Sequence, residues 1–287
     1  HNFNVSKIMI LTIDIGGTNI KYGLCNDAGC FLQKGEYTTP QTTQDIIESI
    51  CSLPFDYTGI AISMPGIMNE DHSNAYITGK LSFLSEYPLK DKIMKIKNCK
   101  VTLENDGRCA TWAELGFGNL QNSKNALVVV LGTYIGMGIV IDHKVYEGSH
   151  LLAGEYSDAH MDKEKTYKNT MAAYFGKDGL KRATGLTGKE LFDSLDNEKV
   201  YAGFNEFCGN LAWMLSNIQL LLDVDTILIG GGISSQPKLI ACIKENMNCV
   251  KPWFSTLKIP EIQACKFNND ANLLGALYYY NNNTENY

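Results

Sequence analysis

The sequence predicts an α/β protein built as two lobes of duplicated design. A short apolar run, a Gly-Thr turn and a second run occur twice, first near residue 8 and again near residue 126. Two copies of one supersecondary unit indicate a duplicated fold. The 287 residues, 45% of them hydrophobic, can form one large domain or two lobes, and the repeat favours two lobes with a ligand between them.

The first copy predicts a strand, a glycine turn and a second strand. Residues 8–14 form an apolar run short enough for a buried strand, which breaks at Gly16-Gly17-Thr18. Apolar and polar residues alternate after the break, and residues 26–29 supply the next turn. The glycines therefore join two strands in a hairpin, whereas a Rossmann fingerprint would open a helix. A GxxxxGK[ST] sequence, the mark of a P-loop, does not occur.

The second copy repeats this order farther along the chain. Residues 126–131 predict a buried strand, 132–138 a glycine-rich turn and 139–141 the next strand. A third glycine cluster, Gly230-Gly231-Gly232, lies between an expected strand at 227–229 and a helix that begins at Pro237. Apolar spacing also predicts a long helix over 204–222 and a helix from residue 271, while loops and short helices are expected over 149–187.

The first hairpin carries residues suited to phosphoryl transfer, which needs phosphate-binding groups, a metal anchor and a carboxylate base. Gly16 and Gly17 let backbone amides approach phosphate oxygens, and the Thr18 hydroxyl adds a donor. Asp14, at the end of the strand, could hold Mg²⁺ through water. A tight turn capped by Asp explains the isolated motif equally well. The second Gly-Thr turn shifts the balance toward function.

A carboxylate suited to act as a base is expected at the junction of a strand and a helix near residue 106. Asp106 follows the run 101–105, and Glu104 and Asn105 beside it could bind hydroxyl groups of the substrate. The alternative is that Asp106 or Asn105 only caps the helix. Without the glycine turns, the cap would be the preferred interpretation.

Motifs along almost the whole chain resemble those of the ROK family. They are Asp14-Ile15-Gly16-Gly17-Thr18 with Lys21, Met64-Pro65-Gly66, Glu104-Asn105-Asp106, Gly132-Thr133, Ala153-Gly154-Glu155 and Gly230-Gly231-Gly232-Ile233. The resemblance implies the actin-like, hexokinase-like ATPase fold of two duplicated ribonuclease H-like domains. It also implies a kinase that uses ATP and Mg²⁺ on a small-molecule sugar, and a homodimer.

The resemblance assigns roles to particular residues. Asp106 is the expected catalytic base, and Asp14 is expected to hold Mg²⁺ through water. Sugar contacts are expected from Asn105, Glu155, Asp158, Gly66 and Glu104. ATP contacts are expected from Asp14, Gly16, Gly17, Thr18, Lys21, Gly132, Thr133, Gly230, Gly231 and Gly232.

Three less specific stretches, 186–192, 232–237 and 272–278, resemble the corresponding sequences of zinc-free members such as β-glucoside kinases. The CxCGxxGCxE cluster of the zinc-binding members is missing, so no zinc site is expected. The resemblance then implies transfer of the ATP γ-phosphoryl group to a hydroxyl, the one at carbon 6, of a hexose or β-glucoside. The alternatives are an N-acetylmannosamine kinase, a glucokinase, or a catalytically degenerate sensor of sugar or nucleotide.

Four positions depart from the family pattern. Arg108 replaces a small polar residue and either binds a phosphate on the substrate or points to solvent. Tyr134 and Met137 replace glycines in the second turn, which conflicts with any need there for positive φ. Asp158 stands where many members have a histidine that contacts sugar. These changes indicate an altered substrate pocket.

Composition restricts the partners and the location. The net charge of −6 disfavours nucleic acid and anionic membranes. No apolar run is long enough for a bilayer span, so a cytoplasmic protein is expected. With only seven residues ahead of the first strand, we expect no DNA-binding module there. The expected lobes are residues 1–106, with the helix 271–287 packed back on them, and residues 107–270.

Overall fold

The computed structural model of the chain describes residues 8–164, 166–250 and 258–283, which divide into two units. Those within 1–117, 148–152 and 269–287 form the first unit, and those within 118–147 and 153–268 form the second. Residues 1–7 and 284–287, which the sequence assigns to the first lobe, lie outside the described residues.

The first unit is built on a five-stranded sheet with the order β3-β2-β1-β4-β7. Its strands are β1 (Met9–Ile15), β2 (Asn19–Asn26), β3 (Phe31–Thr38), β4 (Gly59–Met64) and β7 (Lys100–Asn105). β1 pairs antiparallel with β2 and parallel with β4, which in turn pairs parallel with β7. The predicted hairpin around the first glycine turn is therefore confirmed. A two-stranded ribbon, β5 (Ile67–Met68) and β6 (Ala75–Tyr76), follows β4.

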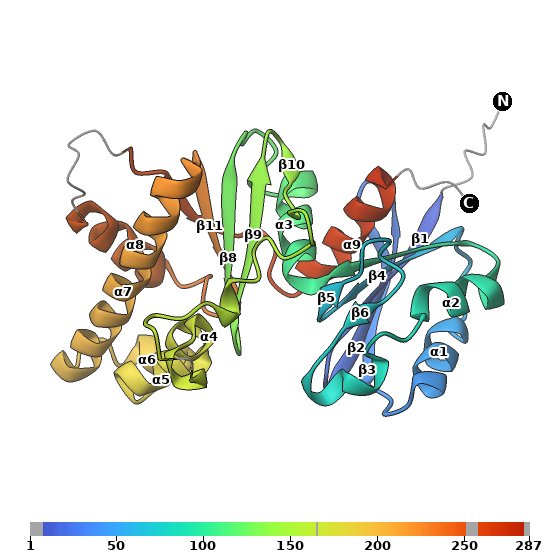
Figure 1. Ribbon diagram of the computed structural model, residues 1–287, viewed down its shortest axis with the longest axis horizontal. Coiled ribbons are helices and arrows are strands. Elements are labelled where there is room, and N and C mark those ends of the chain that lie inside the picture. The colour runs from blue at the N-terminus through green and yellow to red at the C-terminus, as the bar shows by residue number, and fades with distance from the viewer. Residues whose placement is uncertain (1–7, 165, 251–257, 284–287) are drawn as a thin grey trace. The chain divides into compact units, whose positions relative to one another are not determined.

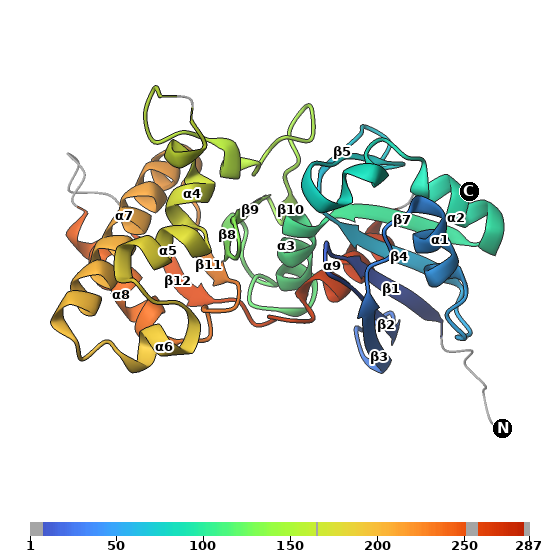
Figure 2. The same ribbon diagram turned by 90° about the horizontal axis from the view of Figure 1, so that it is seen from below.

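Helices cover both faces of this sheet (Figures 1 and 2). Leu11 and Ile13 of β1 pack into a core with α1 (Thr43–Cys51) and α2 (Leu89–Lys97), where the 3₁₀ helix Gly79–Leu84 also contributes. Ile10 points to the other face, where it joins α3 (Asp106–Phe117) and α9 (Ala271–Asn282). Because side chains alternate along a strand, one apolar run supplies both cores.

The second unit repeats the design with the strand order β10-β9-β8-β11-β12. Its strands are β8 (Ala126–Leu131), β9 (Ile135–Ile141), β10 (Lys144–Val145), β11 (Thr226–Gly230) and β12 (Glu261–Ala264). β8 pairs antiparallel with β9 and parallel with β11, as β1 does with β2 and β4. The predicted duplication is confirmed, although β9 begins earlier than expected and the second turn is shorter.

Helices of the second unit form one large core with its sheet (Figures 1 and 2). They are α4 (Met171–Phe175), α5 (Lys177–Thr184), α6 (Gly188–Asp193), α7 (Glu198–Leu222) and α8 (Pro237–Cys249), with the 3₁₀ turns Tyr156–Asp158 and Tyr167–Asn169. The predicted long helix and the helix beginning at Pro237 are both confirmed. Of the helices in the described residues, none combines the length and the apolar character that crossing a bilayer requires.

Helices α3 and α9 approach so closely that Gly275 has no room for a side chain. A Cβ atom there would lie 1.7 Å from the carbonyl oxygen of Cys109. We expect Gly275→Ala to destabilise the protein by about 1–3 kcal/mol, because the two backbones would have to separate. Urea unfolding followed by circular dichroism measures this loss.

Gly209→Ala in α7 is the matched control for this prediction. Both substitutions gain the helix propensity of Ala over Gly, roughly 1 kcal/mol. At Gly209 the new Cβ would lie 3.1 Å from the side-chain oxygen of Asn246, which can move aside. Equal stability of the two variants would contradict the close backbone approach at Gly275.

Candidate active site

Polar residues gather where the parallel strands of the first sheet end. Asp14 lies near the end of β1, and Asn105 and Asp106 lie where β7 passes directly into α3. The parallel pairing of β1, β4 and β7 brings their carboxyl ends to one edge of the sheet. In open α/β sheets this edge is where ligands bind.

Asp14 is half-buried and close enough to Asp106 for the two carboxylates to repel each other. Burial and then the charge of Asp106 raise the pKa of Asp14 to about 6, while Ser63, Asn272 and Lys21 act in the opposite direction. The amide Nδ2 of Asn272 donates to Oδ1 of Asp14 over 3.2 Å. An amide is neutral, so Asn272 adds no positive charge, and the charge of Lys21 offsets only part of the repulsion between the two carboxylates.

Asp106 has a raised pKa, and its carboxylate takes part in few hydrogen bonds. Its side chain is half-buried, and Oδ1 accepts a hydrogen bond of 2.8 Å from the N–H of Gly107. Burial raises the pKa of Asp106, and the backbone N–H groups of Gly107 and Asp106 work against that rise. A carboxylate with a raised pKa accepts a proton more readily near neutral pH, as a general base must.

Asn105 caps α3 and holds the segment after β4 at the same time. Its Oδ1 accepts from the N–H of Arg108 over 3.1 Å, and its Nδ2 donates to the carbonyl of Gly66 over 2.8 Å. The alternative considered from sequence, a helix cap, therefore describes Asn105. Among the described residues, one N–H and one lone pair of the amide have no further partner, so the sugar contacts expected of Asn105 and Gly66 remain predictions.

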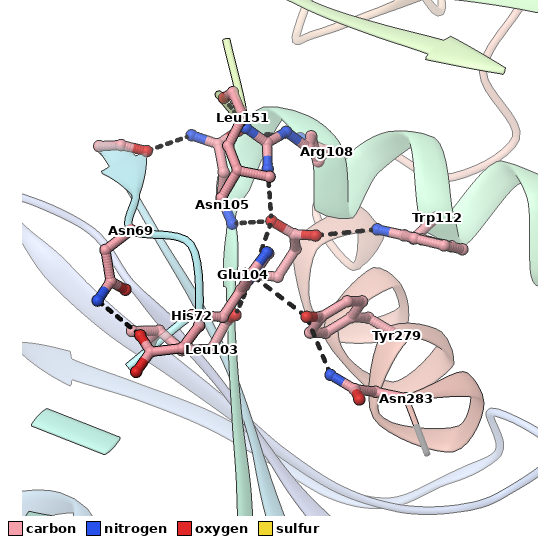
Figure 3. Close-up of polar contacts among 12 residues, drawn as sticks. Asn69, His72, Leu103, Glu104, Asn105, Arg108, Trp112, Leu151, Tyr279 and Asn283 are labelled. Atoms are coloured by element: carbon pink, nitrogen blue, oxygen red, sulfur yellow. Dashed lines mark hydrogen bonds and ion pairs between the residues drawn. The ribbon is translucent and has the colours of Figure 1, made fainter. Parts of the chain in front are cut away.

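Glu104 and Arg108 form a buried ion pair beside this junction (Figure 3). The Nη1 atom of Arg108 lies 3.4 Å from Oε1 of Glu104, and both residues are almost wholly inaccessible to solvent. Neither alternative considered for Arg108 is right, because the guanidinium neither points to solvent nor lies exposed to a substrate phosphate. Glu104 has internal partners, and its expected sugar contact stays a prediction.

The first glycine turn is held by backbone contacts that leave Thr18 exposed. Gly16 donates to the carbonyl of Asn19 over 3.0 Å, and the hydroxyl of Thr39 donates to the carbonyl of Gly16 over 2.6 Å. Gly17 lies beside the methylene stem of Lys80, since a Cβ at Gly17 would meet Cδ of Lys80 at 3.5 Å. No local sequence pattern predicts the approach of Lys80 to this turn.

The second unit contains a pocket of about 340 Å³ at the end of β8. This volume falls within the range of small-ligand sites. Most of the lining is apolar or glycine, with one lysine and one threonine. The lining residues are Leu131, Gly132, Phe175, Gly176, Lys177, Leu180, Thr187, Gly188, Phe207, Gly232 and Ile233.

The second glycine turn packs against the start of α5. The N–H of Lys177 donates to the carbonyl of Gly132 over 2.9 Å, and a Cβ at Gly176 would lie 2.4 Å from the carbonyl oxygen of Thr133. Gly132, Thr133 and Lys177 are all exposed at this point. A helix N-terminus and a lysine next to an exposed turn favour binding of an anion there.

The replacements Tyr134 and Met137 do not conflict with the backbone. Neither residue has positive φ, so the anticipated strain does not arise. Tyr134 is exposed, and Met137 is buried in the core of the second unit.

Gly231, in the third glycine cluster, is the position there that requires glycine. Its φ is +95°, and a Cβ would lie 2.1 Å from the carbonyl oxygen of Leu131. Gly230 is buried and Gly232 is exposed on the pocket. The expected adenosine contacts of this cluster remain predictions.

The segment that carries Glu155 packs against β9. Gly154 has a φ of +90°, and a Cβ there would lie 2.5 Å from the carbonyl oxygen of Met137. Glu155 is half-buried and precedes a 3₁₀ turn that ends at Asp158, which is exposed. Both residues lie in the second unit.

The sequence missed most of the pocket in the second unit. Phe175, Leu180 and Phe207 come from three helices whose apolar spacing only indicates core packing. Asn272 was also missed, because its contact with Asp14 joins residues 258 positions apart. Thr187 and Gly188 did carry a signal, since they lie in the stretch 186–192 that resembles the family.

Comparisons with known proteins agree with this geometry. The family model described as ROK family matches residues 10–283. A β-glucoside kinase of Listeria monocytogenes is 28% identical over 94% of this chain and 97% of its own length. An N-acetylmannosamine kinase of Haemophilus influenzae is 26% identical over 94% of each chain.

A solved structure extends the likeness to the fold. A ROK family protein from Streptococcus pneumoniae TIGR4 in complex with sucrose has a TM-score of 0.86 and 28% identity, with 95% of this chain and 98% of that chain covered. The chain therefore has the actin-like, hexokinase-like ATPase fold that the sequence predicts.

Proposed function

Because the chain belongs to the ROK family, we propose that it is a sugar kinase that uses ATP. The acceptor is a hydroxyl, the primary one at carbon 6, of a hexose or β-glucoside. The observation that carries this proposal is Asp106, a half-buried carboxylate with a raised pKa at the ligand-binding edge of the first sheet.

Asp106 would act as the general base. The N–H of Gly107 holds Oδ1 of its carboxylate, and the raised pKa suits that carboxylate to take the proton of the attacking hydroxyl. Its position as the first residue of α3 fixes the direction of the carboxylate. The helix cap formed by Asn105 sets that first turn in place.

The pocket of the second unit suits a nucleotide. Its apolar walls, among them Phe175 and Phe207, would take the base, and Gly232 leaves the pocket open beside them. The exposed turn Gly132-Thr133, with Lys177 and the start of α5, would take phosphate oxygens. The turn Gly16-Gly17-Thr18 with Lys21 would do so in the first unit.

Asp14 and its surroundings fit Mg²⁺. Two neighbouring carboxylates, of which Asp14 has a pKa raised to about 6, form a site where added positive charge is stabilised. Asp14 would hold the ion through water, and the ion supplies charge neutralisation to the phosphates when bound. Asn272 fixes the direction of the carboxylate through its hydrogen bond.

The relatives support the acceptor class. The two named kinases act on a β-glucoside and on N-acetylmannosamine, and the pneumococcal structure holds sucrose. Hydroxyls of such a sugar would be bound by Asn105, Gly66, Glu155 and Asp158.

We further propose that the enzyme is a cytoplasmic homodimer. Light scattering after size exclusion measures the mass of the assembly.

The Gly232→Val variant tests the nucleotide pocket. Apart from its chain neighbours, none of the described residues comes within 4 Å of a Cβ at Gly232, and its φ is not positive, so the chain tolerates the side chain while the pocket loses space. We expect KM for MgATP to rise by about ten- to a hundredfold, with KM for the sugar and the melting temperature unchanged. Ser235→Val, in the same loop but outside the pocket lining, is the control. A similar KM for MgATP in both variants would show that the nucleotide does not bind in this pocket.

The proposed function is tested by an ADP-release assay with MgATP. The panel contains glucose, N-acetylmannosamine, cellobiose, sucrose and aryl β-glucosides. Sugar-dependent turnover, with the product phosphorylated at carbon 6 by NMR, is the expected result. Binding of MgATP with no turnover on any sugar would contradict the kinase proposal.

A further inference from the structure

The ion pair of Glu104 and Arg108 is the centre of a buried polar network in the first unit (Figure 3). Glu104 is wholly buried, and Arg108 is 1% exposed. Oε1 of Glu104 also accepts from the N–H of Asn105 over 2.6 Å, and Oε2 accepts from Nε1 of Trp112 over 3.1 Å. The carboxylate is thus fixed on the strand side and on the helix side of the β7–α3 junction.

The network continues behind Glu104 to α9. Nδ1 of His72 lies 3.1 Å from the carbonyl oxygen of Leu103 and 3.1 Å from the hydroxyl of Tyr279. The Tyr279 hydroxyl also accepts from Asn283 over 3.0 Å. These contacts hold the strand and helix residues around the ion pair together.

Arg108 also reaches a segment distant in sequence. Its Nη2 donates to the carbonyl of Leu151, 43 residues along the chain. Leu151 has a φ of +57°, which is unfavourable for leucine, so outside contacts must hold this backbone. The segment 148–152 groups with the first unit although the residues on either side of it belong to the second.

The position of Leu151 in the chain links this contact to the expected sugar-binding residues. Glu155, an expected sugar contact, follows four residues later. On its other side Arg108 donates its backbone N–H to Asn105 and its guanidinium to Glu104, the residues that precede Asp106. One side chain therefore joins the strand-to-helix junction that carries the base to the chain leading into the second group of sugar contacts.

Two buried charges would be an expensive way to stabilise a core, because a well-packed apolar pair often serves as well. The planar guanidinium offers several donors in a fixed geometry, which lets it bind a carboxylate and a carbonyl at once. A lysine ammonium has one nitrogen and cannot reproduce both contacts in the same positions. The choice of arginine therefore indicates a need for both.

We propose that Arg108 is a positioning residue for the sugar, which it serves by fixing the segment 148–152 to the β7–α3 junction. The proposal rests on the proposed kinase function. Arg108 does not touch substrate itself. It acts through Leu151 on the approach to Glu155 and through Glu104 and Asn105 on the junction before Asp106.

The first test is the kinetics of Arg108→Lys and of the double variant Glu104→Gln/Arg108→Met. Arg108→Lys keeps a cation for Glu104, and the double variant removes both buried charges, so each avoids an isolated charge. In both we expect KM for the sugar to rise by about ten- to a hundredfold, with KM for MgATP unchanged and a smaller change in kcat. Arg182→Met is the control, since the chain's other arginine also donates to a backbone carbonyl, that of Ala173.

A role restricted to stability would lower the melting temperature and the active fraction and leave the KM for the sugar unchanged. That outcome, in either folded variant, overturns the proposal. An equal rise in both KM values overturns it as well, because the effect would then not be specific to the sugar.

Hydrogen exchange separates this inference from the proposed function. The amides of residues 148–155 should exchange about tenfold or more faster in Arg108→Lys than in wild type, and at the wild-type rate in Arg182→Met. Unchanged exchange overturns the proposal even if the kinetics change. If wild type phosphorylates no sugar, the proposed function fails on its own, and exchange still decides whether Arg108 holds the segment.

Discussion

Replacing Asp106 by asparagine is expected to lower kcat by about a thousandfold, the typical contribution of a general base. Asparagine keeps the shape of the side chain and an acceptor for the N–H of Gly107, so α3 should begin as in wild type. It cannot take a proton from the acceptor hydroxyl. KM for MgATP and the affinity for the sugar should stay within about threefold of wild type, since the loss belongs to the transition state.

The measurement is steady-state turnover with sugar binding followed by calorimetry. Asp193→Asn is the control, because Asp193 is exposed and forms a surface ion pair with Lys189. If Asp106→Asn kept a tenth or more of the wild-type kcat, another group would have to be the base.

Replacing Asp14 by asparagine is expected to reduce activity and to stabilise the ligand-free protein. We expect kcat/KM to fall by about a hundredfold or more, because the site loses the carboxylate proposed to hold Mg²⁺. In the folded protein the charged form of Asp14 is disfavoured by burial and by Asp106. Removing that charge should raise the free energy of unfolding at neutral pH by on the order of 2 kcal/mol.

The gain in stability should depend on pH in a definite direction. The pKa of Asp14 is about 6 in the folded chain, above its ordinary 3.8, so the folded state binds the proton more tightly. The contribution of Asp14 to stability therefore falls as pH rises from about 4 to about 6, and the full penalty is present above that range. Asp14→Asn should unfold at a higher temperature than wild type at pH 8 and at an equal one near pH 4.

Thermal melts of both proteins across this pH range measure the difference. Asp27→Asn on the turn after β2 should show no such trend. If Asp14→Asn melted at or below the wild-type temperature at pH 8, the surroundings of Asp14 would not destabilise its charged form.

MgATP is expected to stabilise wild type more than Asp14→Asn, because the variant binds it more weakly and binding to the folded state adds to its stability.

Local sequence patterns predicted the strands and turns whose formation depends on residues close together in the sequence. The apolar runs before Gly16 and Gly132 became β1 and β8, each followed by an antiparallel partner, because buried strands and glycine turns are encoded within a few residues. The β7–α3 junction at Asp106 was predicted for the same reason.

Contacts between distant residues were not predictable in this way. An arginine in a helix is most often exposed, yet Arg108 is buried because Glu104 and the carbonyl of Leu151 both meet it. The pKa of Asp14 depends on Asp106, and its orientation depends on Asn272. These groups come together only in the folded topology, so no periodic pattern in the sequence could predict their contacts.

The packing of α9 on α3 has a consequence for synthesis on the ribosome. Ile10, Ala61 and Cys109 share a core with Ala276 and Leu277, so this face of the first sheet is completed by residues synthesised long after its strands. More than 150 residues separate α3 from α9. At about 5–20 residues per second, the part of this face that α9 covers stays exposed for roughly ten seconds or longer. The first unit therefore cannot finish folding until α9 has been synthesised, and nascent chains that stall before residue 271 should be substrates for chaperones.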